Sequence, residues 1–350
     1  MPLPAVDVII PHYRGRERLF KCLESLSNTN YEDFRVLIVD NGSSDGSVKN
    51  IVEHFPETEV VRLKDNLGFA GGCNAGVLES NKEFTALLND DTEVEPDWLK
   101  NLVEVILSDD KIAAVQPKLL RTQVKNQFDY AGGVGGMIDV FGYPFCFGRL
   151  FETREYDEGQ YDNVSDIFWA SGSASLFRRE MYLAAGGLDE KFFAHQEEID
   201  LNWRLQLMGY KIKAAPAAVV HHYGGGTLSE ASFRKKYLNH RNSLMMLGKN
   251  YELKTLVWVM PVRFCLEAAS IILAVRQGDI KRIAAVLGAA FWNFSHLLVI
   301  RWERKRIKTL RKVPDSEIIK RMFAGTVALQ YYIFGKKTYN QLINNNYKNN

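Results

Sequence analysis

Short apolar runs alternate with amphipathic stretches along the N-terminal third of the chain. The apolar runs are rich in β-branched residues and end in polar or glycine-containing segments, which is typical of buried strands. The expected strands are VDVIIPHY (6–13), FRVLIVD (34–40), EVVRLK (59–64) and FTALLNDD (84–91), with helices over 16–28, 48–55 and 68–80. Strands that alternate with helices form parallel, doubly wound sheets. The pattern therefore predicts an α/β fold with a mostly parallel sheet.

The regular pattern is interrupted in the middle of the chain and then resumes. Residues 119–165 are rich in glycine and aromatic residues without a sustained period, which predicts loops and small strands. A strand is expected over 168–177, helices over 179–185 and 198–208, and a strand over 211–222. We find no internal repeat.

The last third of the chain has a different character. An expected basic amphipathic helix over 232–250 precedes two apolar stretches, 255–275 and 283–300. The first contains proline, arginine and glutamate, and the second is at the lower limit of length for a membrane span. The basic segment RWERKRIKTLRK (301–312) follows. Three interpretations remain open: a buried core helix beside a solvated basic segment, docking on an anionic membrane surface, or a true span.

Composition narrows the class of protein. The 350 residues are 46% hydrophobic and 25% charged, which permits one large core with an appendage. The 44 basic and 42 acidic residues leave a net charge of +2, so the chain lacks the global charge of a nucleic-acid-binding protein. The four cysteines are scattered without zinc-type spacing, which favours a reducing compartment. Without a recognisable signal peptide, we expect a cytoplasmic protein, peripheral on the inner face of the cell membrane.

Polar residues gather where three expected strands end, at 40–42, 65–66 and 89–91. In parallel sheets, ligands bind beyond the carboxyl ends of the strands. A second acidic cluster, 197–200, begins an expected helix, and a histidine pair, 221–222, ends an expected strand. Turn chemistry and favourable charges in the first turn of a helix explain each cluster separately. Their convergence on one cleft would instead indicate a site that handles a divalent cation and a proton.

The motifs that carry these polar residues resemble those of glycosyltransferase family 2. They are VIIPHYRGRERLFKCLESL, VDNGSSDGS, DNLGFAGGCNAG, LLNDDTEVEPDWL, GSASLFRRE, GGLDEKFFAHQEEIDLNWRLQLMGY and VVHHYGGGT, in this order over about residues 5–245. The subgroup they resemble includes bacterial rhamnosyltransferase-like enzymes. The resemblance implies a GT-A fold over 1–230, with a nucleotide-sugar half (1–118) and an acceptor half (119–230). Residues 231–350 would form a helical, membrane-associating extension.

The resemblance also implies roles for individual residues. The metal, Mg²⁺ or Mn²⁺, would be held by Asp91 and His222, with His221 less favoured, and the catalytic base would be Glu198. The sequence departs from the family pattern in having Asn89 and Glu198 where many relatives have aspartate. The nucleotide would contact Pro11, Tyr13, Asp40, Asn66, Gly68, Asn89 and Asp90, and the sugars would contact Trp169, Gly172 and Glu197. For Asp40 an Asx turn, and for His222 a satisfied histidine at a strand end, remain open as structural alternatives.

The implied activity is inverting, metal-dependent transfer from a nucleotide-diphosphate sugar, such as dTDP-rhamnose or a UDP-sugar. The acceptor would be a saccharide or lipid-linked saccharide in surface polysaccharide assembly, and the oligomeric state stays open. A sugar-nucleotide pyrophosphorylase is disfavoured because PHYRGRERL is a poor phosphate loop. A processive synthase would carry a QxxRW motif, whereas the chain has LVIRW at 298–302. A non-catalytic sugar-binding protein is the remaining alternative, separable by metal-dependent hydrolysis of a sugar nucleotide.

Overall fold

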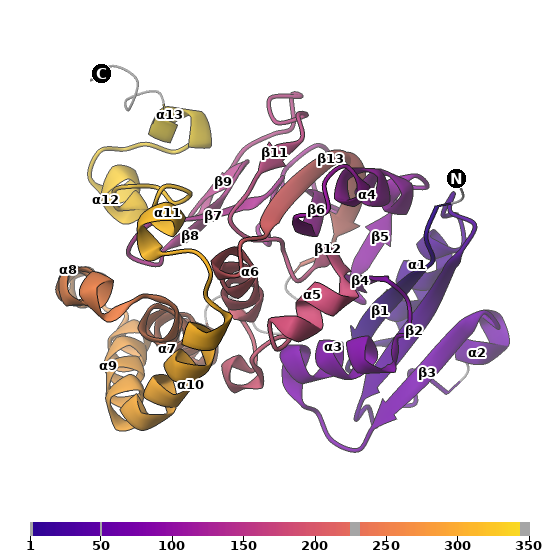
Figure 1. The fold of residues 1–350 in the computed structure, drawn as a ribbon, viewed down its shortest axis with the longest axis horizontal. Helices are drawn as coiled ribbons and strands as arrows, with labels where there is room; N and C mark the ends of the chain where they lie inside the picture. Colours follow the sequence, from indigo (N-terminus) through magenta and orange to yellow (C-terminus); the bar gives the residue numbers. More distant parts are fainter. Residues whose placement is uncertain (1–2, 50, 225–231, 344–350) are drawn as a thin grey trace.

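A twisted sheet runs through the centre of the computed structural model, which describes residues 3–49, 51–224 and 232–343 (Figure 1). Its strand order is β11-β13-β6-β12-β4-β1-β2-β3, with β5 paired to β13. β1, β2, β3 and β4 are parallel, as are β6 and β13, whereas β12 is antiparallel to both of its neighbours. The strands are β1 Val6–His12, β2 Phe34–Asn41, β3 Thr58–Leu63, β4 Phe84–Leu88, β5 Thr92–Val94, β6 Ile112–Arg121, β11 Ser165–Asp166, β12 Ala174–Arg178 and β13 Lys211–His222. The expected α/β fold with a mostly parallel sheet is confirmed.

Helices cover both faces of this sheet, because side chains of each strand alternate between two cores. Val8 and Ile10 of β1 belong to the core under α1 and α4, and Ile9 belongs to the core under α3 and α6. Helix α3 lies close to the sheet at Gly76, where a Cβ atom would stand 2.3 Å from Ile9 Cγ2. The helices of this part are α1 Arg16–Leu26, α2 Ile51–His54, α3 Gly68–Glu79, α4 Trp98–Leu107, α5 Arg179–Ala184, the 3₁₀ helix η1 Glu190–Phe192 and α6 Glu197–Leu207.

The glycine-rich middle segment forms a small antiparallel sheet beside β11 and β13, at the end of the main sheet opposite β3 (Figure 1). It therefore contains small strands, as expected. Its strands are β7 Gly136–Ile138, β8 Pro144–Cys146, β9 Arg149–Leu150 and β10 Thr153–Arg154. This second sheet forms one wall of the site described below.

Two expectations for this region were wrong or incomplete. The strand expected over 168–177 begins only at Ala174, because Trp169 makes an isolated bridge with Gly136 and the next residues turn. At that turn Ser171 N donates to Gln116 Oε1 at 2.8 Å. Strand β6 was not expected over its first residues, although it is central in the sheet and buried along nearly all its length. Its apolar run is interrupted by Gln116, Pro117 and Lys118, whereas β4 is a run of apolar residues and one threonine.

The helices that follow the sheet lie to one side of the small sheet and α6 (Figure 1). They are α7 Phe233–Asn250, α8 Leu253–Gln277, α9 Ile280–Ser295, α10 Leu297–Leu310, α11 Asp315–Ile319, α12 Val327–Tyr332 and α13 Tyr339–Ile343. The helix expected over 283–300 is broken at His296, where α9 and α10 meet at 68°. The predicted domain boundary between residues 230 and 231 lies outside the described residues, within 225–231.

Helix α8 carries its apolar side chains outward and its charges inward. Val257 is 76% exposed and Ile272 57% exposed, whereas Arg263 and Glu267 are buried and paired at 2.6 Å. By length and composition α8 is the single helix among the described residues that could cross a membrane, and the bent pair α9 and α10 could form a broken span. The outward apolar face shows that α8 is not a buried core helix.

Candidate active site

A cavity of about 860 Å³ opens where the carboxyl ends of β4, β6 and β13 meet. Its wall includes residues that directly follow these strands or begin α6. Asp91 and Glu198, to which the family resemblance gives the cation and the proton, both line it. The two carboxylates therefore share one cavity. The lining also includes Asn89, Asp129, Trp169, Gly172, Glu197 and His222.

A histidine between two carboxylates forms one end of the cavity. His222 Nε2 lies 3.2 Å from Asp91 Oδ1, and His222 Nδ1 lies 2.9 Å from Asp129 Oδ1. All three side chains are buried. Burial alone would lower the pKa of His222, but the contacts with Asp129 and Asp91 outweigh it and raise this pKa to about 10. Contact with His222 in turn lowers the pKa of Asp91 against the opposing effect of burial.

Asp91 and His222 fit a divalent cation that would take the place of the proton on His222 Nε2, because a histidine binds metal in its neutral form. Asp91 Oδ1 is buried and has no aligned hydrogen-bond partner, and the facing imidazole nitrogen is a common metal ligand. Asp129 would fix the ring orientation of His222 through Nδ1, as partners of metal-bound histidines do. No group of three or more His, Cys, Asp and Glu side chains in the described chain could hold a metal by itself. The remaining ligands would be water and diphosphate oxygens, which suits Mg²⁺.

Two adjacent glutamates at the start of α6 form the opposite wall. Glu197 is buried, Glu198 is half-buried, and each has an Oε2 atom without a hydrogen-bond partner. Burial raises the pKa of Glu198 to about 7, and burial together with repulsion from Glu198 raises the pKa of Glu197 well above its usual range. Glu198 is the more exposed of the two, which leaves it better placed to accept a proton from a bound ligand.

The loop that leads into this acidic pair has an unusual backbone. Phe193, His195 and Gln196 have φ angles of 63°, 70° and 71°, a region that non-glycine residues rarely adopt. The buried amide of Asn242, on α7, donates through Nδ2 to three carbonyl oxygens of this loop: Phe192 (3.2 Å), Ala194 (2.9 Å) and His195 (2.7 Å). The conformation is thus fixed from outside the loop, by the helix that follows β13.

Arg241 supports the same loop from the adjacent position of α7. Its Nη2 atom donates to the carbonyl oxygens of Lys191 at 2.8 Å and Phe192 at 2.9 Å. Two consecutive residues of α7 therefore bind the segment that leads to the glutamates.

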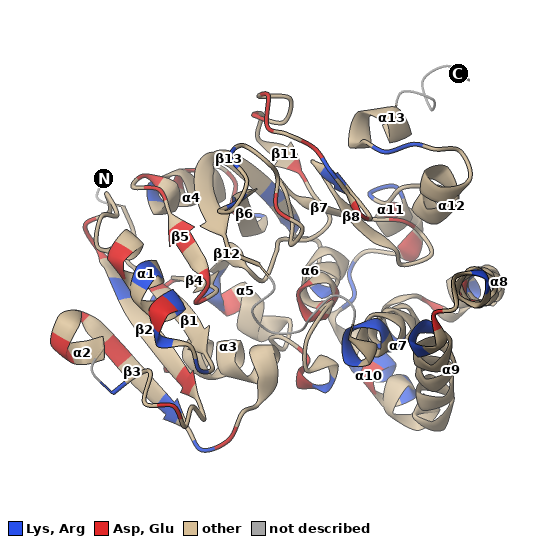
Figure 2. Cartoon of the chain, turned by 180° about the vertical axis from the view of Figure 1, so that it is seen from behind, with Lys and Arg blue, Asp and Glu red and all other residues tan. Residues whose placement is uncertain are grey.

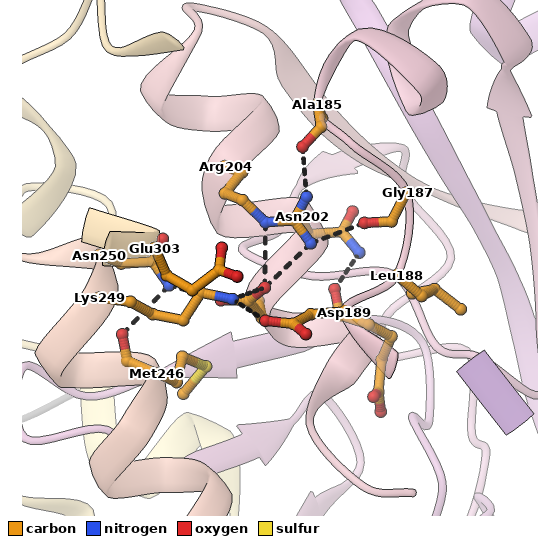
Figure 3. A network of polar contacts seen from close by, with 12 residues as sticks. Ala185, Gly187, Leu188, Asp189, Asn202, Arg204, Met246, Lys249, Asn250 and Glu303 are labelled. Carbon is orange, nitrogen blue, oxygen red and sulfur yellow. Dashed lines mark hydrogen bonds and ion pairs between the residues drawn. The ribbon is translucent and has the colours of Figure 1, made fainter. Parts of the chain in front are cut away.

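A buried charge network joins α6, the helix that begins with the two glutamates, to α7 (Figure 3). Lys249 Nζ lies 3.1 Å from Asp200 Oδ2 and 2.5 Å from Asp189 Oδ2. Asp200 also accepts from Arg204 Nε at 3.0 Å and from Asn250 Nδ2 at 2.7 Å. Every charge in the network has a partner, which buried ions require. Asp200, one of the acids of the 197–200 cluster, is therefore structural.

The remaining expected nucleotide residues lie along the ends of β1, β2 and β4. Asp90 turns away from the large cavity and accepts from His12 Nδ1 at 2.6 Å, while His12 Nε2 lies 2.8 Å from Ser47 Oγ. Asp40 lines a separate hollow of about 220 Å³. Asp40 Oδ1 accepts from Ser43 N at 2.9 Å, so the Asx-turn alternative is present in the structure. A turn and a ligand contact through the second oxygen are compatible.

Four other residues expected to contact the nucleotide lie outside the large cavity. Tyr13 is 40% exposed beside the Arg14 guanidinium, and Pro11 is half-buried in β1. Asn66 Oδ1 accepts from Gly68 N at 2.8 Å. Gly68 has φ of 74°, and a Cβ there would stand 2.7 Å from the Phe193 carbonyl oxygen, so this glycine adjoins the acidic-pair loop. None of these four lines the large cavity.

The expected sugar-side residues do line the cavity. Trp169 is 4% exposed, and its Nε1 atom donates to Met137 O at 2.9 Å, which fixes the indole against the small sheet. Gly172 faces Phe69, whose ring would stand 2.9 Å from a Cβ at this position. Asn89 N donates to Ser173 O at 2.9 Å, which brings the end of β4 beside the start of β12.

Sequence reasoning missed Asp129, Arg241 and Asn242. Asp129 lies in a segment without periodicity, and no spacing relates it to His222. Arg241 and Asn242 stand in a helix that the sequence assigned to a separate extension. A pair of large polar residues on the buried face of an amphipathic helix, Arg241 and Asn242, is the signal that would have found the second case.

Comparison with families of known proteins gives a consistent result. The chain matches the model of "Glycosyl transferase family 2" over residues 7–183. It is similar to an N-acetylglucosaminyl-diphospho-decaprenol L-rhamnosyltransferase of Mycobacterium tuberculosis, with 25% identity over 76% of this chain and 90% of that protein. It is also similar to the O-antigen biosynthesis protein RfbC of Myxococcus xanthus, with 27% identity over 71% of this chain and 20% of that protein.

Two solved structures share the fold at low identity. One is GalNAc-T7 with UDP, GalNAc and Mn²⁺, with a TM-score of 0.57, 14% identity, and coverage of 72% of this chain and 49% of that one. The other is the mannosyltransferase PcManGT from Pyrobaculum calidifontis in complex with GDP-Man and Mn²⁺, with a TM-score of 0.51, 17% identity, and coverage of 91% and 87%.

Proposed function

Because this chain belongs to glycosyltransferase family 2 and has the GT-A fold, we propose that it is an inverting, metal-dependent sugar transferase acting on a lipid-linked saccharide. That it is a glycosyltransferase of polysaccharide or lipid-linked saccharide synthesis follows from the family and the relatives. The observation that carries the finer proposal is the single cavity shared by Asp91, His222 and Glu198. One sugar bound there would have a cation site on one side and a proton acceptor on the other.

The proposed chemistry assigns one task to each wall of the cavity. Glu198 takes the proton of the acceptor hydroxyl as its oxygen bonds to the anomeric carbon, and the bond from that carbon to the donor diphosphate breaks with its electron pair. Asp91 and His222 would hold Mg²⁺ or Mn²⁺, which supplies positive charge for the departing diphosphate. Asp129 holds the His222 ring. Attack from the face opposite the leaving group inverts the anomeric centre.

The donor and acceptor classes rest on the relatives and on the site. The rhamnosyltransferase relative acts, by its name, on an N-acetylglucosaminyl-diphospho-lipid, and the solved relatives bind nucleotide sugars. We propose a deoxyhexose donor such as dTDP-rhamnose, with UDP-sugars as the second class. We also propose a division at residue 230 into a catalytic domain and a helical extension. The extension supports the catalytic domain, because Asn242 and Lys249 of α7 contact α6 and the loop before it.

A panel of nucleotide sugars tests this function. The purified chain is incubated with each sugar nucleotide and Mg²⁺ or Mn²⁺, with and without a lipid-linked saccharide, and nucleoside diphosphate and product are measured by mass spectrometry. We expect one donor class to be consumed, and only with metal present. Glu198→Gln should abolish this consumption. Failure of every donor to turn over, with nucleotide binding intact, would favour the non-catalytic sugar-binding alternative.

We also propose that the chain docks peripherally on the cytoplasmic face of an anionic membrane. The outward faces of α8, α9 and α10 carry large exposed apolar side chains, of which Leu298 is 82% exposed and Phe291 and Phe294 are each 74% exposed. Arg301, Lys305 and Lys308 lie exposed on α10, where Figure 2 shows basic residues gathered, and their charge suits anionic headgroups. Not all of the basic segment is free for this purpose, because Arg304, Arg306 and Arg311 bond within the protein.

Sedimentation with vesicles tests the docking. The intact chain should bind vesicles containing phosphatidylglycerol and should bind phosphatidylcholine vesicles more weakly. Replacing Phe291, Phe294 and Leu298 together by serine should abolish binding without affecting hydrolysis of the donor. Equal partitioning of the variant and the unaltered chain would rule out this surface.

A further inference from the structure

A cluster of cations around one aromatic ring lines the cavity on the side away from the proposed nucleotide end. The Tyr130 ring carries the Arg149 guanidinium 4.0 Å from its centre, Lys235 Nζ at 5.1 Å and the Arg154 guanidinium at 5.5 Å. All four residues line the cavity that contains Asp91. They come from β9, β10, the loop after β6 and the start of α7. Neither the metal site nor the glutamate pair uses them.

Arg149 is the informative member of this cluster. It is only 6% exposed, and its Nε atom has no hydrogen-bond partner. Among the residues that the structure describes, no carboxylate forms an ion pair with it. By contrast, Arg263 lines the same cavity but is bonded to Glu267 at 2.6 Å. A buried guanidinium without a counter-ion is costly, and such a group facing a cavity is expected to bind an anionic ligand.

The position of the cluster argues against the donor diphosphate as that anion. Asp91 and His222 already provide for the donor diphosphate through a cation, and Asp40 marks the nucleotide end at β2. The small sheet that carries Arg149 and Arg154 lies beside β11 and β13, at the opposite end of the main sheet (Figure 1). The cluster nevertheless adjoins the cation site, because Tyr130 directly follows Asp129, which bonds His222 at the end of β13. Since the cation already serves the donor diphosphate, we assign the anion at Arg149 to the acceptor.

We propose that Arg149, Arg154, Lys235 and Tyr130 form a binding site for the diphosphate of a lipid-linked acceptor. The proposal rests on the function proposed above and specifies how its acceptor is held. The acceptor sugar occupies the cavity between Asp91 and Glu198, and its diphosphate lies at the cluster. The cavity reaches Arg263 on the inward side of α8, and the attached lipid chain would pass this helix to its apolar outward face. Arg149 can hold the phosphate oxygens bidentately, which a lysine cannot.

Binding of farnesyl diphosphate tests the site without knowledge of the sugar. Titration calorimetry is performed on the full chain with the donor site filled by excess UDP and Mg²⁺, and again with dTDP and Mg²⁺. Farnesol, which lacks the diphosphate, is the control ligand. The unaltered chain should bind farnesyl diphosphate at least tenfold more tightly than farnesol. Arg149→Gln should remove roughly 10- to 100-fold of that affinity, the effect of one charge-assisted hydrogen bond. Arg149→Lys should recover part of it.

Matched variants separate this site from general charge and from folding. Lys111→Gln removes one exposed positive charge elsewhere and should leave binding unchanged. Lys235→Gln, in a half-buried position, gives a second measurement if Arg149→Gln does not fold. Unchanged farnesyl diphosphate affinity in the folded variants would overturn the proposal, as would a loss confined to UDP or dTDP binding. Because this assay needs no sugar transfer, its outcome is independent of whether the proposed activity is found.

Discussion

Replacing Asn242 tests whether α7 positions Glu197 and Glu198, the second of which is the proposed base. The residues with positive φ at 193, 195 and 196 each cost on the order of 1–3 kcal/mol. The Asn242 amide donates to three carbonyl oxygens of that segment with its two hydrogens, so it amounts to about two full bonds, or roughly 1–3 kcal/mol. Loss of the amide therefore removes a stabilisation comparable to the strain of one such residue.

We expect Asn242→Ala to lower kcat roughly 5- to 150-fold, which corresponds to about 1–3 kcal/mol of misplacement of Glu198. The KM for the donor should change little, because the donor's cation site is on the other wall. Asn242→Asp keeps the shape but offers no N–H donor to the carbonyl oxygens, so its kcat should fall at least as far. The assay is steady-state release of nucleoside diphosphate, with thermal unfolding measured in parallel.

Asn293→Ala is the matched control for this experiment. Asn293 Nδ2 donates to the carbonyl oxygens of Arg241 at 3.0 Å and Ala289 at 2.9 Å, so its removal also costs side-chain contacts with backbone. Among the described residues, its side chain makes no hydrogen bond to residues 192–196. The kcat of Asn293→Ala should therefore stay near that of the unaltered protein. The reasoning is refuted if both Asn242 variants keep kcat within twofold, or if kcat falls in all three variants only in proportion to lost stability.

Three further predictions concern the other parts of the site. Because burial raises the pKa of Glu198 to about 7, kcat/KM measured from pH 5.5 to 9 should fall as the pH drops below 7. Glu198→Gln should be roughly 10²- to 10⁴-fold slower and should lose this decrease at low pH. The same decrease in the variant would assign it to another group. Chelation should stop turnover and Mn²⁺ restore it, and Asp91→Asn should weaken Mn²⁺ binding at least tenfold by electron paramagnetic resonance; equal binding would exclude Asp91 as a ligand. Lys249→Met should lower the free energy of unfolding in denaturant by about 3–5 kcal/mol, because the Asp189 and Asp200 carboxylates lose a buried partner. Adding Asp189→Asn should restore part of this stability. Strictly additive losses in the double variant would contradict the network.

The N-terminal strands were predictable because each is a short, mostly apolar run that ends in a polar or glycine-containing segment, although β1 and β4 are buried on both faces. The N-terminal strands and helices and the strand at 211–222 follow their hydrophobic patterns closely. Strand β6 was missed because Gln116, Pro117 and Lys118 interrupt its apolar run. The apolar run at 283–300 was taken as one helix because composition alone does not show the bend at His296.

The site was predictable where its chemistry follows strand and helix ends. Asp91, Glu198 and His222 stand at such ends, and the topology brings these ends to one edge of the sheet. Asp129, Asn242 and the cations around Tyr130 depend on contacts between segments far apart in the chain, which no local pattern encodes. Asp40 and Asp90 were placed at the correct edge, but the structure turns them toward His12, Ser43 and a smaller hollow.

The buried charge network between α6 and α7 constrains how relatives of this protein can be recombined. A hybrid enzyme joined at residue 230 would combine residues of this network from two parents: Asp189, Asp200 and Arg204 from one, and Lys249 and Asn250 from the other. Any mismatch would leave a buried charge without a partner. A crossover placed after Tyr251 keeps all partners within one parent. Swapping of α8, α9 and α10 between homologues should therefore tolerate that later joint far better than the earlier one.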